Sequence, residues 1–231
     1  MRIKAPSYFP NWETHSVLHD SEPRRLQMIG AIALQWNFIE DVVDECLQVV
    51  LGLVELGTDV TSRINGMDGK TAILHKAIKA NKFFNDGEKK LLKTAFDAIS
   101  EYKKYRDGII HARVPSPSAN VALTAPNRGD AYYIIVATVA LELVYQRLEL
   151  MGDEIVGAYR LLESGSFEEY DLISEGGNVD PLKLRASESF QAALALIQEH
   201  QSRRLSLQPL PQFEVTDPSP PASATTQEPQ G

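Results

Sequence analysis

The sequence places an arginine and a histidine five residues apart near the end of a predicted helix, Arg106 and His111, with Asp107 directly after the arginine. A guanidinium group binds anions through paired hydrogen bonds, and a histidine exchanges protons near neutral pH. This pattern predicts a site for an anionic ligand with His111 as a candidate acid or base. A histidine in the last turn of a helix also interacts favourably with the helix dipole, which is a purely structural explanation for His111.

Arg106 falls inside an apolar face of this helix, where a charged side chain needs compensation. In a helix from about residue 85 to 114, six apolar residues lie within about 60° of one direction, and Arg106 lies among them. An unpaired buried arginine is costly, so we expect an acidic partner, a subunit interface or an anionic ligand at this position. The six residues are Leu92, Ala95, Ile99, Tyr102, Ile109 and Ile110.

An acidic residue lies in the apolar face of the predicted first helix. Glu40 is about 40° from the direction shared by Trp36 and Val43. A Glu40–Arg106 ion pair across two packed helices would satisfy both groups, with Asp44 one turn later as a substitute. Such a pair would either fix the register of the two helices or orient Arg106 towards a bound anion, and both interpretations stay open.

The segment YKKYRDGIIH, from Tyr102 to His111, resembles the signature of the HEPN superfamily. That signature is an arginine, a polar residue, three further residues and a histidine at the C-terminal end of a long helix. Arg106, Asp107 and His111 match it. The long preceding helix with its internal Glu40 and the predicted helical bundle are also similar to that superfamily, and the resemblance covers about residues 22–162.

The resemblance implies a homodimer in which two Arg/His motifs face one another in a cleft and act as a metal-independent endoribonuclease. In such a site, His111 would exchange protons with the ribose 2′-hydroxyl or the leaving 5′-oxygen. Arg106 would bind the scissile phosphate, and Asp107 would orient one of them or shape the cleft. Tyr102 and Tyr105 would pack between helices or stack on a base.

The implied ligand is RNA or a nucleotide, without a metal or cofactor. Members of the superfamily are often toxins or antiviral effectors, which implies an antitoxin or regulatory protein as a further partner. Two alternatives remain: a catalytically silent HEPN-like helical module that binds a nucleotide, RNA or a protein, and an unrelated helical protein with an accidental match. The sequence lacks an HExxH motif, a phosphate-binding glycine loop after a strand and a nucleophile elbow.

An all-α bundle of four or five helices is predicted to position these residues. Apolar residues at helical spacing predict helices over 23–54, 70–81, 85–114, 130–162 and 181–204. For residues 132–135 there is an alternative to the helix: they could pair with residues 121–124 as a β-hairpin. Gly165, Gly176 and Gly177 predict a loop after that helix.

Composition predicts one helical domain with two polar ends. Residues 1–21 form an N-terminal extension, 22–206 the bundle, and 207–231 a disordered tail that contains six of the 13 prolines. The 231 residues suffice for one sizeable core. No targeting segment or apolar stretch of bilayer length is apparent, and a single cysteine excludes an internal disulfide, so we expect a cytoplasmic protein. That cysteine, Cys46, is expected to be a core residue and not a nucleophile.

The net charge of −8 is unevenly distributed. Residues 69–114 contain 11 basic and 5 acidic residues, a net charge of +6, whereas the flanking segments are acidic. Solvated helix faces would explain this segment. The alternative is a basic surface that attracts an anionic polymer such as RNA although the whole chain is acidic.

Overall fold

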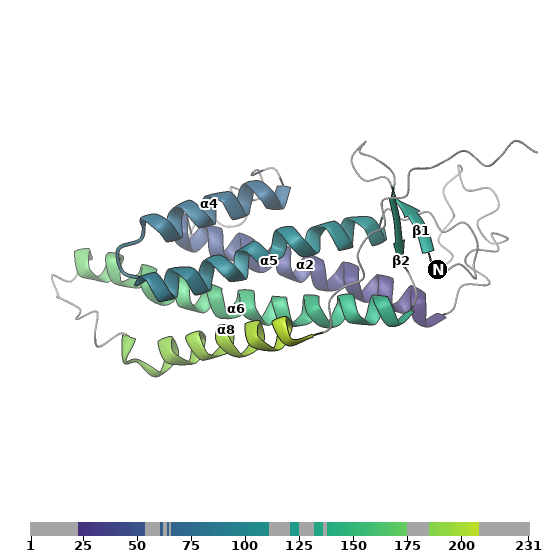
Figure 1. The fold of residues 1–231 in the computed structure, drawn as a ribbon. Coiled ribbons are helices and arrows are strands. Elements are labelled where there is room, and N and C mark those ends of the chain that lie inside the picture. Colours follow the sequence, from purple (N-terminus) through teal and green to yellow (C-terminus); the bar gives the residue numbers. More distant parts are fainter. Residues whose placement is uncertain are drawn as a thin grey trace, which may run out of the picture.

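The computed structural model describes residues 23–53, 61, 64, 66–110, 121–124, 132–135, 138–174 and 185–207. Within these ranges, five helices form an all-α bundle, which confirms the predicted fold class (Figure 1). None of the described helices is long and apolar enough to cross a membrane. The helices are α2 (Pro23–Leu51), α4 (Gly66–Ala80), α5 (Asp86–Ile110), α6 (Thr138–Ser174) and α8 (Glu188–Ser206).

The long helices lie side by side, and α4 packs against α2 and α5 (Figure 1). Helices α5 and α6 run in opposite directions, because Tyr102 contacts Arg147 while Phe84 lies against Gly165. The bundle therefore has two distinct ends. We call the end with the C-termini of α5 and α8 and the N-terminus of α6 the motif end, and the end with the α4–α5 turn the turn end (Figure 1).

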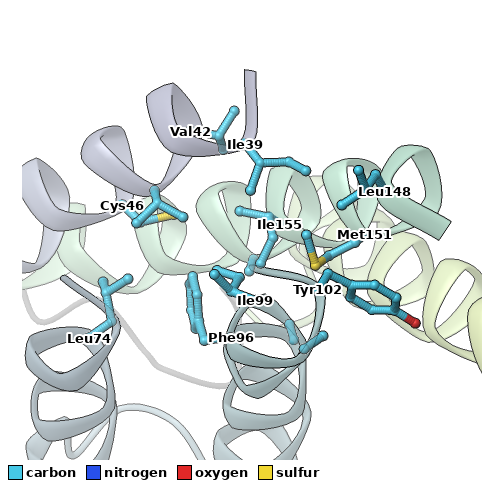
Figure 2. Packing of buried hydrophobic residues seen from close by; sticks show 14 of the residues in the cluster. Ile39, Val42, Cys46, Leu74, Phe96, Ile99, Tyr102, Leu148, Met151 and Ile155 are labelled. Carbon is cyan, nitrogen blue, oxygen red and sulfur yellow. The ribbon is translucent and has the colours of Figure 1, made fainter. Parts of the chain in front are cut away.

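Apolar side chains from all five helices fill one continuous core. The apolar face predicted for α5 is buried at Leu92, Ala95, Ile99, Tyr102 and Ile109, and Ile110 is half-buried. Figure 2 shows Ile99 and Tyr102 of α5 beside Ile155 and Met151 of α6, with Ile39 of α2 across the core. Burial of this stripe against two neighbouring helices is the main stabilising contribution that α5 can make, because its opposite face is charged.

Two helix starts are fixed by side-chain caps. At α5, Asn85 Oδ1 accepts the backbone N–H of Glu88 at 2.9 Å, and Glu88 Oε2 accepts the backbone N–H of Asn85 at 2.7 Å. This reciprocal capping box confirms the predicted start near Asn85. Helix α8 begins at Glu188, where Ser187 accepts the N–H of Phe190 and acts as the N-cap. The first residues of the helix predicted over 181–204, residues 181–184, lie outside the described residues.

The predicted helical start at residue 130 is wrong. Residues Tyr132–Ile135 form strand β2, which pairs antiparallel with β1 (Val121–Thr124), and α6 begins at Thr138. Tyr and Ile are strong strand formers, and the register places Leu123 opposite Tyr133. The hairpin that the sequence allowed as an alternative is therefore the observed structure.

The loop predicted at Gly165 is also wrong, because α6 continues to Ser174. A Cβ atom at Gly165 would lie 2.6 Å from Cζ of Phe84 and 3.0 Å from Cδ1 of Phe83. Gly165 is therefore required by close packing of α6 against the α4–α5 turn, and it does not end the helix. Glycine in a helix interior is unfavourable, so the sequence pattern alone predicted a break.

Cys46 lies in the core of α2, fully buried, and burial raises the pKa of its thiol (Figure 2). The thiolate is the reactive form, so we expect the native thiol to react with Ellman's reagent at pH 8 at least about 100-fold more slowly than the urea-unfolded chain. Free glutathione serves as the reactivity reference. Rapid labelling of the native protein would contradict this placement of Cys46.

Candidate functional site

Arg106 lies near the C-terminus of α5, on the side that faces α2. Its guanidinium carbon is 5.7 Å from the centroid of the Trp36 ring, and Nη1 donates to Oδ1 of Asp107 at 2.8 Å. The Arg106 side chain is 25% exposed. Its Nε is buried and has no hydrogen-bond partner among the described residues. The group is thus held by an aromatic face and one carboxylate, with further N–H donors available to an anion.

The predicted Glu40–Arg106 ion pair is not formed. Oε1 of Glu40 instead accepts the indole N–H of Trp36 at 2.6 Å, one turn away on the same helix. Trp36 thus contacts both charged residues: its N–H binds Glu40 and its ring face lies against Arg106. The structure replaces a direct ion pair by an aromatic ring, which an arginine tolerates well because its planar group stacks on aromatic faces.

The substitute partner predicted for Arg106, Asp44, is also occupied elsewhere. Its carboxylate lies 2.6 Å from Nζ of Lys70, near the start of α4, and both side chains are mostly buried. The angle of Asp44 around α2 allows a contact with Arg106. Its position along α2 does not, because α4 packs on α2 beside Asp44 and supplies Lys70 as its partner.

The two tyrosines before Arg106 pack inside the bundle. Tyr102 is 1% exposed, so its ring is not free to stack on a base, and the packing alternative describes it (Figure 2). Tyr105 is half-buried, with its ring centroid 6.5 Å from that of Tyr102. Desolvation and the nearby charge of Glu101 raise the pKa of Tyr105, so its hydroxyl stays protonated at neutral pH.

A buried polar cluster between α5, α6 and α8 was not anticipated from the sequence. Glu154, with no exposed surface, accepts from Nε of Arg204 at 2.8 Å and from Gln201 at 2.7 Å. Arg204 also lies over the ring of Tyr102, at 5.9 Å from its centroid. The Tyr102 hydroxyl accepts from Arg147 at 3.1 Å, which in turn donates to the carbonyl of Leu207 at 3.0 Å.

This cluster has a structural role in joining three helices. Desolvation opposes the charge of Arg204, but the hydrogen bonds and charge of Glu154 raise the pKa of Arg204 overall. A buried ion pair of this kind fixes one register of α8 against α6. It also places Tyr102, one turn before Arg106, in a fixed position on α5.

The described residues of the basic segment, 69–110, do not gather their charges at one end of the bundle. Three of its lysines are paired with carboxylates: Lys70 with Asp44, Lys93 with Asp97, and Lys103 with Asp68. The others include a group at the α4–α5 turn, at the opposite end of α5 from Arg106. The charge that appears continuous in sequence is therefore divided between the two ends of the bundle.

His111 follows the last described residue of α5 and lies outside the described residues, so its distance from Arg106 stays a prediction. The extension at 1–21 and the tail after residue 207 also lie outside them. Among the residues that the structure does describe, no group of three or more histidine, cysteine or acidic side chains is arranged to hold a metal ion.

Comparison of the chain with protein-family models, with curated proteins and with solved structures finds no match. The residues and their geometry are therefore the basis for assigning a function to this chain.

Proposed function

We propose that this protein is a metal-independent endoribonuclease of the HEPN type, with Arg106 and His111 as its working pair. The observation that supports this best is the environment of Arg106: half-buried, stacked on Trp36 and bound to Asp107, with a buried Nε that no described residue satisfies. A buried donor without a partner is costly, and a phosphate oxygen would satisfy it.

In this proposal each motif residue has a separate role. Arg106 binds the scissile phosphate and stabilises the charge that develops on it. Asp107 holds one edge of the guanidinium, and Trp36 supports its face. His111 exchanges protons with the ribose 2′-hydroxyl or the leaving 5′-oxygen, which yields a 2′,3′-cyclic phosphate when the 2′-oxygen attacks.

A composite site in a homodimer would require contact at the motif end. The exposed apolar residues of α2 include Leu34 at 71% and Phe38 at 43% exposed. Leu34 lies about 160° around α2 from Trp36, so these side chains face away from Arg106. Association through that surface would not bring two copies of Arg106 together. We therefore place the proposed dimer contact near the end of α5.

The test is cleavage of single-stranded RNA in the presence of EDTA. We expect the wild type to cleave and to leave 2′,3′-cyclic phosphate ends. His111→Ala and Arg106→Ala should each reduce the rate by about 100-fold or more. Lys104→Ala is the matched control, because Lys104 is exposed on the same turn of α5 and has the same charge. It should cleave at nearly the wild-type rate.

Absence of cleavage by the wild type, or equal cleavage by His111→Ala, would contradict the proposal. The alternative is a silent helical module in which the Arg106–Asp107 pair only stabilises the end of α5, an interpretation that their 2.8 Å ion pair favours. In that case Arg106→Ala would lower the stability of the protein without any change in RNA chemistry.

A further inference from the structure

We infer that lysines at the turn end bind the phosphate backbone of RNA at a distance from the scissile bond. We call this group the lysine cap. This inference deepens the proposed function and rests on it for the identity of the ligand. The lysine cap consists of Lys76, Lys79, Lys82, Lys89 and Lys90.

The lysine cap brings together residues from two helices and the turn between them. Lys76 and Lys79 lie in the last two turns of α4, Lys82 in the turn, and Lys89 and Lys90 in the first two turns of α5. Nζ of Lys89 donates to the carbonyl oxygen of Lys79 at 3.3 Å, which places the two helices' lysines side by side. All but the half-buried Lys89 are exposed.

The ion pairs among the described residues do not involve the lysine cap. None of its five lysines forms an ion pair within the part of the chain that the structure describes, in contrast to Lys70, Lys93 and Lys103. Within residues 76–90 only two residues are acidic, Asp86 and Glu88.

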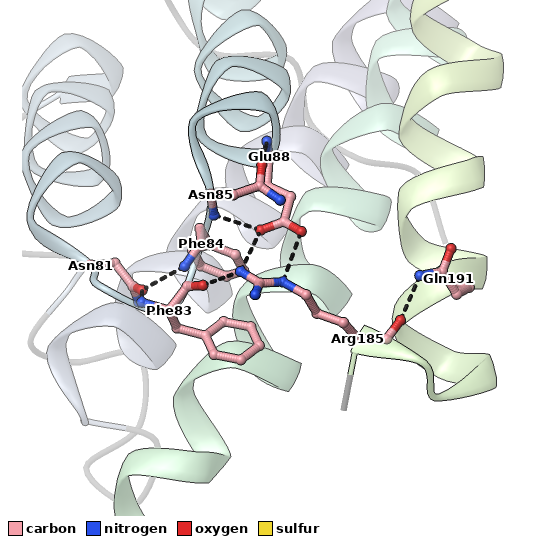
Figure 3. Close-up of polar contacts among 7 residues, drawn as sticks. All are labelled: Asn81, Phe83, Phe84, Asn85, Glu88, Arg185 and Gln191. Carbon is pink, nitrogen blue, oxygen red and sulfur yellow. Dashed lines mark hydrogen bonds and ion pairs between the residues drawn. The ribbon is translucent and has the colours of Figure 1, made fainter. Parts of the chain in front are cut away.

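Glu88 does not neutralise the charge of the lysine cap, because its carboxylate is already ion-paired with Arg185 (Figure 3). Nε of Arg185 lies 3.2 Å from one Glu88 oxygen and Nη2 lies 3.2 Å from the other. Arg185 also donates to the carbonyl of Phe83 and stacks on its ring at 5.1 Å. With Glu88 paired to Arg185, the five lysines outnumber the one other acidic residue within residues 76–90, Asp86, which gives this segment a local excess of positive charge on an acidic protein.

Phosphate fits this surface better than a protein partner does. Protein interfaces need apolar or aromatic anchors at their centre. The exposed large apolar side chains of the described residues lie on α2 and α8 and not on α4 or α5: Leu26, Leu34, Phe38, Leu51 and Leu205. Flexible lysine ammonium groups without such anchors are suited to contact a phosphate backbone without sequence preference.

The position of the lysine cap sets a length requirement. Lys90 and Arg106 are 16 residues apart on one helix, so about 24 Å separates them along the axis. A stacked strand advances about 3.4 Å per nucleotide, so about seven nucleotides would connect Arg106 with the lysine cap. RNA shorter than this should reach Arg106 without touching the lysine cap.

The test compares two double variants of the full chain. Lys79→Gln with Lys90→Gln removes two charges of the lysine cap, and Arg160→Gln with Arg203→Gln removes two exposed charges on α6 and α8, of which Arg203 is ion-paired with Glu199. Binding of a fluorescent single-stranded RNA 20-mer and 4-mer is measured by anisotropy over a range of salt concentrations. We expect the lysine-cap variant to bind the 20-mer about tenfold more weakly, with a salt slope smaller by about 1.4, and to leave the 4-mer unchanged.

Equal affinity of the wild type and the lysine-cap variant for the 20-mer would overturn the inference, and so would an equal loss in the matched control or a wild type that does not bind RNA. These outcomes are independent of cleavage. Loss of 20-mer affinity in the lysine-cap variant alone, with RNA left intact by the wild type, would support the lysine cap and count against the endoribonuclease.

Discussion

Replacing Glu154 by alanine is expected to lower the free energy of unfolding by about 3–5 kcal/mol. Glu154 is fully buried, and its carboxylate is the acceptor for both Arg204 and Gln201. Without it, the 3%-exposed Arg204 would remain charged and buried without a carboxylate partner. Urea unfolding monitored by circular dichroism measures the change. Glu149→Ala is the matched control, because Glu149 is an exposed residue of the same helix and should change stability little.

A second variant separates the cost of an unpaired buried charge from the loss of the polar contacts themselves. When both charges are replaced by apolar residues of similar size, as in Glu154→Leu with Arg204→Met, no uncompensated charge remains. We therefore expect the double variant to regain most of the stability lost in Glu154→Ala. A double variant as unstable as Glu154→Ala would show that the polar contacts themselves, and not the unpaired charge, stabilise this junction of α6 and α8.

The sequence predicted the helices well because their apolar residues repeat at helical spacing over many turns. That periodicity located α2 and α5, and the burial of Leu92, Ala95 and Ile99 follows from it. It failed where the same spacing also fits a strand. Ile134 and Thr138 are four residues apart, as in a helix, yet Ile134 lies in β2 and Thr138 begins α6.

The contacts of the charged residues could not be predicted in the same way. Helical periodicity gives the angle of a residue around its helix but not its height relative to a neighbouring helix. Glu40 therefore had the correct angle for Arg106 and a different partner, Trp36. The cluster around Glu154 depends on how α8 folds back onto α6 over about 50 residues, which no local pattern in the sequence encodes.

Trp36 joins the core to the candidate site, so its replacement tests both. Trp36 is 1% exposed, and Trp36→Ala is expected to cost about 3–5 kcal/mol in unfolding free energy because it leaves a large cavity. Trp36→Phe retains an aromatic ring near Arg106 and loses only the N–H bound to Glu40 and part of the volume. Its expected cost is about 1–2 kcal/mol.

Trp36→Leu distinguishes support of Arg106 by the ring from simple packing. Leucine fills much of the same space but has no π face, so the 5.7 Å contact with the Arg106 guanidinium is lost. At a temperature where both variants are folded, we expect Trp36→Phe to keep near wild-type kcat on RNA and Trp36→Leu to lose about tenfold, since a displaced guanidinium no longer matches the reacting phosphate. Equal kcat in the two variants would mean that Asp107 alone orients Arg106, and that the ring contributes to stability but not to the position of the site.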